Sequence, residues 1–350
     1  MPYRKTCPYC GEALRPDDAT KSVRCDACGA QFAPGELREQ TEEELLRLLK
    51  QPDQTTNGLG GFVCGNCGAR LIADEAAAAA FCCFCGAPAL EAETIRDVVE
   101  PDWILPFAID RREAQSRFVH RFRAKKLIEP GVVDAAKAGH ISGVYVPFWL
   151  LDATLETHWH AVSSPTETER AEHNETVTAR HFCHYRRTVS EYKTVPADAS
   201  ERIDGRLMNL LGPFDLSQLV PFDPALSKDF FAEANTFTAE QTFQRVREQL
   251  EADALRAARD AAESQSYAET KSCRHLYQSL SAQYALLPVW ILTCRAGGYA
   301  QAFFMNGQTG KIVGEAPLSL TRALQWFGGV TAAVAAAGEL IWFTLDKYLK

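Results

Sequence analysis

Eight cysteines in the first 85 residues repeat in a fixed register, and this feature limits the possible folds more than any other. Each CxxC pair is followed by a glycine. Two residues between cysteines let one tight turn direct two thiolates at one ion, and the glycine can adopt the positive φ of that turn. Adding 57 to the positions of the first set gives those of the second: Cys7, Cys10, Cys25 and Cys28, then Cys64, Cys67, Cys82 and Cys85.

Each set of four cysteines predicts a closed zinc site. Four thiolates complete a tetrahedron and leave no position for water, so both sites are expected to be structural. The ribbons are too small to build a core, and metal binding would supply their folding free energy. We therefore expect two Zn²⁺ ions per chain, with iron as the alternative metal. Cys83 breaks the register and is predicted not to be a ligand.

The N-terminus disfavours disulfides as the alternative use of these cysteines. The chain begins MPYRKTCPYC and shows no apolar stretch of the kind found in a secretory signal. We therefore expect a reducing, cytoplasmic environment in which the twelve cysteines are thiols.

The expected fold class is α+β, with two tandem four-cysteine zinc ribbons, an internally duplicated α+β domain and a C-terminal hydrophobic helix. Thr41 and Glu44 have the spacing of a capping box and predict a short helix, after which 51–61 predicts a flexible linker. The predicted domains are ribbon 1 at 1–40, the helix and linker at 41–61, ribbon 2 at 62–95, the duplicated domain at 101–319 and the C-terminal helix at 324–350.

Two similar strings indicate the duplication. Val146-Pro-Phe-Trp-Leu-Leu151 and Leu287-Pro-Val-Trp-Ile-Leu292 share one pattern, and each follows a shorter string and a helical stretch. The shorter strings are Ile104-Leu-Pro-Phe107 and Leu219-Val-Pro-Phe222. We therefore predict two related halves at about 101–200 and 215–319, each with a first strand, a helix and a β-meander, in which Trp149 and Trp290 are equivalent.

The second half contains two further recognisable elements. Thr238 and Gln241 form a capping box that begins an acidic helix to about residue 263, with a buried stripe predicted at Phe243, Val246, Leu250, Ala254 and Ala257. Residues 300–313 predict a hairpin that turns at Asn306-Gly307. The same string lacks the residues of a phosphate-binding loop, so no nucleotide is expected.

A basic amphipathic helix is predicted at 111–126. Ala114, Phe118 and Phe122 fall on one face, and seven bases cover the others: Arg111, Arg112, Arg117, Arg121, Arg123, Lys125 and Lys126. Such a helix suits anionic lipid, an acidic partner or a nucleic-acid backbone, or it is a solvated helix that packs its Phe stripe on the sheet. The net charge of −8 disfavours general coating of nucleic acid.

Four histidines on neighbouring strand segments form a weaker candidate site: His158, His160, His181 and His184. A metal or acid/base cluster is one interpretation, and exposed strand histidines with no special role are the other.

The segment Trp326–Leu345 has the length and composition of a membrane-spanning helix. Its strong apolar residues contribute about −3 kcal/mol to insertion, and a carboxylate near the centre costs about +2.5 kcal/mol or more, so insertion is marginal, although Glu339 lies off centre. Gly329, Ala333 and Ala337 form a stripe of small residues suited to helix packing. We expect a membrane anchor, with an amphipathic or buried helix as the alternative.

Four strings resemble a known family, the bacterial TFIIB-type zinc-ribbon-containing proteins. They are Ile141–Asp152, Val195–Ser200, Leu286–Trp290, and Asn306–Lys311 with Val313-Gly-Glu315. The resemblance implies a non-catalytic protein, often with a C-terminal membrane segment, that in some relatives is a partner of membrane-stress or scaffold proteins.

These features together predict a non-catalytic zinc-binding adaptor that binds other proteins at the cytoplasmic side of the inner membrane. The alternative is a soluble zinc-ribbon factor that binds nucleic acid in transcription or replication.

Overall fold

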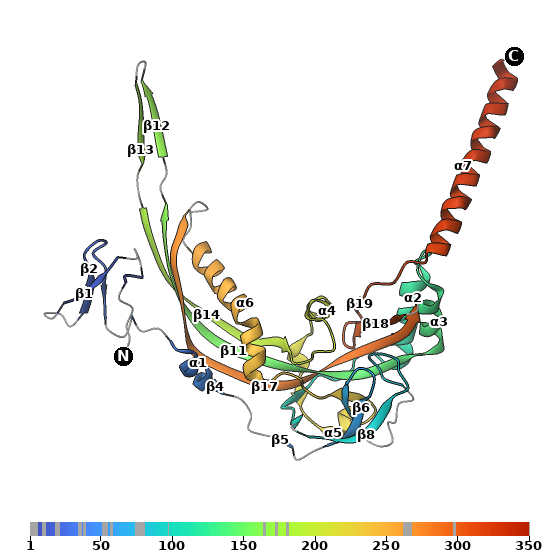
Figure 1. The fold of residues 1–350 in the computed structure, drawn as a ribbon, viewed down its shortest axis with the longest axis horizontal. Helices are drawn as coiled ribbons and strands as arrows, with labels where there is room; N and C mark the ends of the chain where they lie inside the picture. The colour runs from blue at the N-terminus through green and yellow to red at the C-terminus, as the bar shows by residue number, and fades with distance from the viewer. Residues whose placement is uncertain are drawn as a thin grey trace. The chain divides into compact units, whose positions relative to one another are not determined.

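The structure is a computed structural model of the 350-residue chain. It describes residues 6–8, 12–17, 22–33, 37, 40–50, 55–56, 59–73, 81–96, 98–163, 166–171, 174–179, 182–261, 268–296 and 299–349. Two compact units divide the chain. Unit 1 consists of Met1–Asp53, Trp149–Ala197 and Phe237–Gln283, and unit 2 of Gln54–Phe148, Asp198–Thr236 and Tyr284–Lys350. Figure 1 labels the helices and strands.

Ribbon 1 has a small sheet of its own. Strands β1 (Leu14–Asp17), β2 (Ser22–Cys25) and β3 (Gln31–Phe32) pair antiparallel. Helix α1 (Glu42–Leu48) follows, and Thr41 and Glu44 form the predicted capping box. The predicted linker at 51–61 is partly strand, because β5 (Thr55–Thr56) pairs with β9 (Val98–Val99) and β6 begins at Leu59.

Most other described strands join one mixed sheet. The central order is β15 (Val220–Pro221), β10 (Trp103–Ile104), β17 (Glu269–Ala296), β11 (Ile141–Ser163), β16 (Phe231–Glu233), β7 (Arg70–Ile72), β6 (Leu59–Cys64) and β8 (Leu90–Ile95). Strand β14 (Phe182–Asp198) pairs with β11, β18 (Tyr299–Asn306) and β4 (Leu49–Lys50) pair with β17, and β19 (Ile312–Val313) pairs with β18. Strands β12 (Thr166–Ala171) and β13 (Asn174–Ala179) form a separate hairpin.

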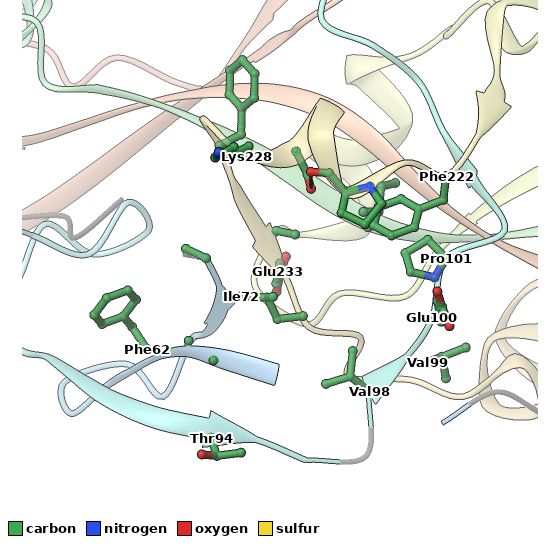
Figure 2. A pocket seen from close by; sticks show the side chains of 18 of the residues that line it. Phe62, Ile72, Thr94, Val98, Val99, Glu100, Pro101, Phe222, Lys228 and Glu233 are labelled. Carbon is green, nitrogen blue, oxygen red and sulfur yellow. Dashed lines mark hydrogen bonds between the residues drawn. The ribbon is translucent and has the colours of Figure 1, made fainter. Parts of the chain in front are cut away.

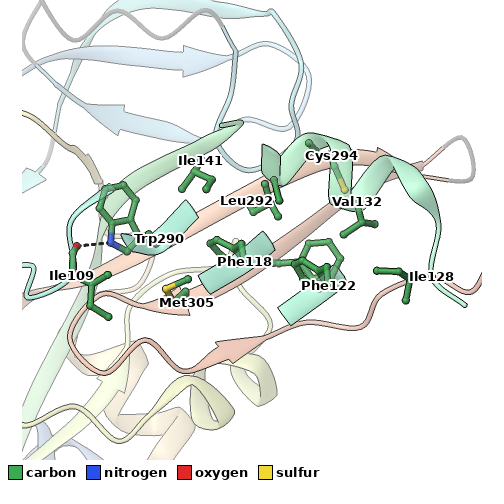
Figure 3. Packing of buried hydrophobic residues seen from close by; sticks show 14 residues of the cluster. Ile109, Phe118, Phe122, Ile128, Val132, Ile141, Trp290, Leu292, Cys294 and Met305 are labelled. Carbon is green, nitrogen blue, oxygen red and sulfur yellow. Dashed lines mark hydrogen bonds between the residues drawn. The ribbon is translucent and has the colours of Figure 1, made fainter. Parts of the chain in front are cut away.

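In unit 2 the long strands are buried on both faces, which explains their unbroken apolar runs. Alternation along β17 sends Trp290 and Leu292 to one cluster and Val289 and Ile291 to the other. Helices α2 (Arg111–Arg123) and α3 (Pro130–Ala138) cover the first face, where the predicted Phe118 stripe is buried, as Figure 3 shows. The second face packs against α4 (Gly205–Leu211) and ribbon 2.

Three sequence predictions are tested directly in the second half. The hairpin is confirmed, because Phe304 pairs with Val313 and Met305 with Ile312. Helix α6 (Ala239–Asp260) has the predicted capping box of Thr238 and Gln241. Its buried stripe was predicted wrongly at two positions: Val246 is only half-buried, and the helix turns Ala258 inward and leaves Ala257 exposed. Two short helices, η3 (Leu216–Gln218) and α5 (Pro224–Ser227), come between β14 and β16 along the chain.

The two tryptophans of the predicted duplication make equivalent contacts. Trp149 Nε1 donates to the carbonyl of Phe237 at 3.0 Å, and Trp290 Nε1 donates to the carbonyl of Ile109 at 2.9 Å. Each acceptor immediately precedes the N-cap residue of a helix, Thr238 of α6 or Asp110 of α2. Each tryptophan thus binds the helix start of the other half, which is the contact expected of two related halves. The duplication itself stays a prediction.

The C-terminal segment is one helix, α7 (Leu320–Leu349). Residues Leu320–Leu345 are long and apolar enough to cross a membrane, and none of this stretch is buried against the rest of the described chain. A rise of 1.5 Å per residue makes these 26 residues about 39 Å long, against about 30 Å of hydrocarbon.

Candidate functional site: two cysteine clusters and a basic surface

Ribbon 2 brings four sulfur atoms to the geometry of a metal site. The Sγ atoms of Cys64 and Cys85 lie 3.7 Å apart, as do those of Cys67 and Cys82, and all four lie within 4.8 Å of one another. A zinc–sulfur bond of about 2.3 Å gives a tetrahedron with edges of about 3.8 Å, whereas a disulfide requires about 2.05 Å. The arrangement suits a tetrahedral metal and excludes disulfides within this cluster.

Repeated backbone hydrogen bonds build the knuckles. The N–H of each first cysteine donates to the carbonyl five residues on, as from Cys64 to Ala69 and from Cys82 to Ala87. The glycine after each second cysteine returns a bond to the first, and Gly68 and Gly86 have φ of 71° and 70°. The left-handed glycine predicted from the sequence is therefore present in both turns.

Ribbon 1 shows the same arrangement in its described part. Cys7, Cys25 and Cys28 form a group, with Cys7 and Cys28 Sγ at 3.7 Å. Cys10, the fourth predicted ligand, lies outside the described residues. Gly29 has φ of 74° and donates to the carbonyl of Cys25, as its counterparts do in ribbon 2.

Cys83 lies apart from the ligand group. Its side chain is buried in the apolar cluster that includes Leu71 and Val146, and its thiol donates a hydrogen bond to the sulfur of Cys82. That bond lowers the pKa of Cys82 to about 4, whereas burial raises the pKa of Cys67. Burial therefore opposes a thiolate at Cys67, and a cation within the cluster would stabilise it.

Ribbon 2 is part of the large sheet, whereas the described strands of ribbon 1 form a sheet of their own. Strand β7 pairs with β16, and the Arg202 guanidinium donates to the carbonyls of Cys67 and Gly68. The Thr293 hydroxyl donates to the carbonyl of Cys83. In the described residues of ribbon 1, the strands pair only with one another. The sequence register gave no sign of this difference, because the two cysteine sets are equivalent in spacing.

The seven predicted basic residues are exposed on and just after α2, and two of them bind within the protein. Arg117 pairs with Glu113 at 2.6 Å and donates to the carbonyl of Thr309. Arg111 donates to the carbonyl of Gly139 at the end of α3. The remaining members have no ion pair within the described chain: Arg112, Arg121, Arg123, Lys125 and Lys126.

The loop after α2 is bound to the start of α7. Ser319 N–H donates to the carbonyl of Leu127 at 2.8 Å, and Glu129 N–H donates to that of Pro317 at 3.0 Å. Arg322, in the first turn of α7, reaches the carbonyl of Ile128 at 3.4 Å. These contacts place Lys125 and Lys126 beside the start of the apolar helix, a proximity that sequence separation conceals.

The three described histidines of this candidate site, His158, His160 and His184, do not form a metal group. The two cysteine clusters are the only sets with metal-binding geometry in the described part of the chain. His158 hydrogen-bonds Glu156 at 2.6 Å and Tyr185 at 2.8 Å, whereas His184 bonds Ser163 at 2.8 Å. Burial lowers the pKa of His158 and of His160. His181 lies outside the described residues.

Glu156 is the centre of this polar network in unit 1. Its buried carboxylate accepts from His158, Arg187 and Gln278, which lie on three different strands. The Arg187 hydrogen bond is the main reason why the pKa of Glu156 lies below its usual range. The sequence signal that could have found it is an acid two residues before His158 on a buried strand.

Replacing Glu156 with Gln is expected to destabilise the protein by about 1–3 kcal/mol at neutral pH, because charged hydrogen bonds are lost. The lowered folded-state pKa means that the carboxylate stabilises the fold above its unfolded-state pKa, and that this stability disappears as pH falls through the folded value. Denaturant unfolding at pH 7 and at successively lower pH below 4.5 should show the difference in unfolding free energy between the two proteins shrink. A difference that stays constant with pH would contradict the assignment.

Comparisons with known proteins find a chain that is similar over nearly its whole length. The protein is 29% identical to the Uncharacterized protein YdjG of Bacillus subtilis (strain 168) over 353 residues, covering 96% of each chain. No protein-family model matches the chain. No solved structure matches it either.

Proposed function

We propose that this protein is a non-catalytic zinc-binding adaptor that α7 holds at the cytoplasmic face of a membrane, where it binds other proteins. The exposed apolar surface of α7, joined to a cluster of bases, is the observation that carries the proposal. Zinc is the metal proposed for both cysteine clusters. The ligands would be Cys7, Cys10, Cys25 and Cys28, and Cys64, Cys67, Cys82 and Cys85.

The apolar surface of α7 supports the proposed membrane location. Phe327 is 72% exposed, Trp342 70% and Leu340 66%. At 3.6 residues per turn, Leu340 lies roughly 140° around the helix from Phe327, so exposed apolar side chains are not confined to one face. A helix that is apolar all round must be covered by lipid or by other helices. The exposed large side chains are Leu320, Leu324, Trp326, Phe327, Val330, Val334, Leu340, Ile341, Trp342, Phe343 and Leu345.

The basic cluster near the start of α7 supports the proposed orientation, in which the ribbons and the sheet lie on the cytoplasmic side of the membrane. Flanking sequence alone sets Arg322 against Lys347 and Lys350, which gives only a weak orientation signal. The contacts of Leu127 and Ile128 with 319–322 add Lys125, Lys126 and the end of α2 to the first side. Bases gather on the cytoplasmic side of spanning helices and bind anionic lipid there. This arrangement favours a cytoplasmic position for the ribbons and the sheet.

Replacing Arg121, Arg123 and Lys125 with Glu is expected to remove contact with anionic lipid without unfolding the protein. Each base near such a surface contributes about 1 kcal/mol, roughly fivefold in binding. The full-length chain in nanodiscs should show slower amide hydrogen exchange at 121–128 with phosphatidylserine than with phosphatidylcholine alone. The triple variant should lose that difference.

The matched control replaces Arg111 and Arg112 with Glu, which reverses the charge at the opposite end of the same helix. Ten residues of helix separate the two groups by about 15 Å, so the control should keep most of the lipid effect. Equal exchange in both lipids would contradict the lipid contact. Salt-dependent binding of DNA or RNA by the same protein would instead support the nucleic-acid alternative.

Ribbon 1 is the part of the adaptor that we propose binds a protein partner. Ribbon 2 uses β7 and Arg202 to stay within the sheet, whereas the described strands of ribbon 1 pair only among themselves. The partner class implied by the family resemblance is a membrane-stress or scaffold protein. Affinity purification from detergent-solubilised native membranes tests this role. A specific partner should be lost with Cys25→Ser and kept with Cys83→Ser, and equal recovery with both variants would refute it.

A further inference from the structure

A cavity of about 620 Å³ lies within unit 2 and has no part in the adaptor function. Strands from ribbon 2 form one side, as Figure 2 shows, and the other walls come from β16, α5, the segment 98–101, Phe222 and the β17 residues Tyr284 and Leu286. The volume is that of a small-molecule site. Its walls are mostly apolar, with Phe62, Ile72, Val98, Phe222, Phe230 and Leu286 among them.

One buried carboxyl group lies among these apolar side chains. Glu233 ends β16, where it pairs with Leu71 of β7, and it is only 2% exposed. Its Oε1 accepts a hydrogen bond from the Ser200 hydroxyl at 2.7 Å. Its Oε2 is buried and has no hydrogen-bond partner among the described residues. An orphaned buried oxygen costs about 1–3 kcal/mol, which a ligand that donates to it would recover.

The charged side chains around the cavity favour a cationic ligand. Glu93 and Glu100 are exposed at its edge, against one base, Lys228. Asp198 and Arg202 act on Glu233 from outside the lining, and burial raises its pKa to about 8. The cavity is therefore acidic on balance, and its Phe rings offer faces that attract cations.

We propose that this cavity binds a small organic cation, an amine that carries an aryl or alkyl group. The apolar walls receive the hydrocarbon part, and the ammonium donates to Glu233 Oε2. A protonated Glu233 releases its proton to solvent as the ammonium binds, so the pair that forms is carboxylate and ammonium. The same carboxylate oxygen would gain much less from a neutral ligand.

Binding of 2-phenylethylamine and of 2-phenylethanol to the full-length chain in detergent micelles tests the proposal. The two probes have nearly the same shape and differ in charge. Calorimetry should show the amine binding at least tenfold more tightly than the alcohol. Glu233→Gln should weaken amine binding at least tenfold and leave alcohol binding unchanged, because the carboxamide keeps the shape and loses the charge.

Two further variants keep the test decisive. Glu93→Gln is the matched control at the edge of the cavity and should weaken amine binding much less than Glu233→Gln. Thr94→Trp fills the cavity from an exposed strand position and should abolish binding of both probes, even if Glu233→Gln fails to fold. Equal affinity for amine and alcohol in the unaltered chain, or amine binding that survives Thr94→Trp, would overturn the proposal.

Discussion

Elemental analysis of the purified full-length protein is expected to find two zinc ions per chain, and chelation is expected to unfold both ribbons. The 3.7 Å sulfur separations in the two clusters fit closed tetrahedral sites. Structural zinc in small ribbons contributes an apparent binding free energy of about 10–16 kcal/mol, which these short segments cannot replace with apolar burial. Metal content and circular dichroism during titration with a chelator measure both expectations.

The zinc content of two single variants should distinguish the predicted ligand Cys82 from its neighbour Cys83, which is predicted not to be a ligand. Cys82→Ser should lose one zinc ion, whereas Cys83→Ser should keep two, because Cys83 lies in the apolar cluster and its hydroxyl replacement still hydrogen-bonds Cys82. Loss of metal from both variants, or one ion per unaltered chain, would falsify the two-site assignment. Iron in place of zinc would keep the sites and change only the metal.

The two ribbons should respond differently when their ligands are lost. Cys64→Ser removes the support of β7, which pairs with β16, so the melting transition of unit 2 should fall. Cys25→Ser affects a ribbon whose described strands pair only with one another, so that transition should stay unchanged. Hydrogen exchange at 231–233 reports on β16 in both variants.

Removing residues 320–350 is expected to move the protein from the membrane fraction into the soluble fraction. Among the described residues, α7 is the one helix that is long and apolar enough to span the hydrocarbon of a membrane, and its apolar side chains are exposed. Fractionation after a carbonate wash measures the change. Full-length protein found entirely in the soluble fraction would mean that another protein surface covers the helix. This result would refute the proposed membrane location of the adaptor.

Glu339 decides how α7 is held. Glu339→Leu removes a carboxylate, whose cost reaches about 2.5 kcal/mol at the bilayer centre, and should strengthen membrane retention of a helix that spans alone. If the carboxylate pairs with a partner helix along Gly329, Ala333 and Ala337, the same change should release that partner on affinity purification. Glu339→Gln is the matched control, because it keeps a hydrogen-bonding group while it removes the charge.

Local chemistry was predictable from the sequence. Capping boxes at Thr41 and Thr238, the Phe118 face of α2 and the turn at Asn306 depend on residues within one or two turns of each other, and all four are present. The cysteine knuckles belong to the same class, because each is one turn. Such features follow from spacing alone.

Contacts between distant segments were not predictable. No pattern announces that Leu127 binds Ser319, that β7 pairs with β16, or that Glu233 lies in an apolar cavity. Helix α3 was missed because Pro130 and Gly139, which begin and end it, also occur in loops. The histidines looked alike in sequence, and only Glu156 and Ser163 show that they belong to separate hydrogen bonds.

The crossed tryptophan contacts set an order of events during synthesis. Trp149 leaves the ribosome 88 residues before its acceptor Phe237, and Ile109 leaves 181 residues before Trp290. At about 5–20 residues per second, the longer wait is roughly 10–40 s. The ribbons have no such delay, since Cys64 and Cys85 are 21 residues apart and can capture a metal early. The nascent chain therefore carries closed ribbons beside an unpaired β11, and a chaperone that shields that strand would raise the yield of folded protein.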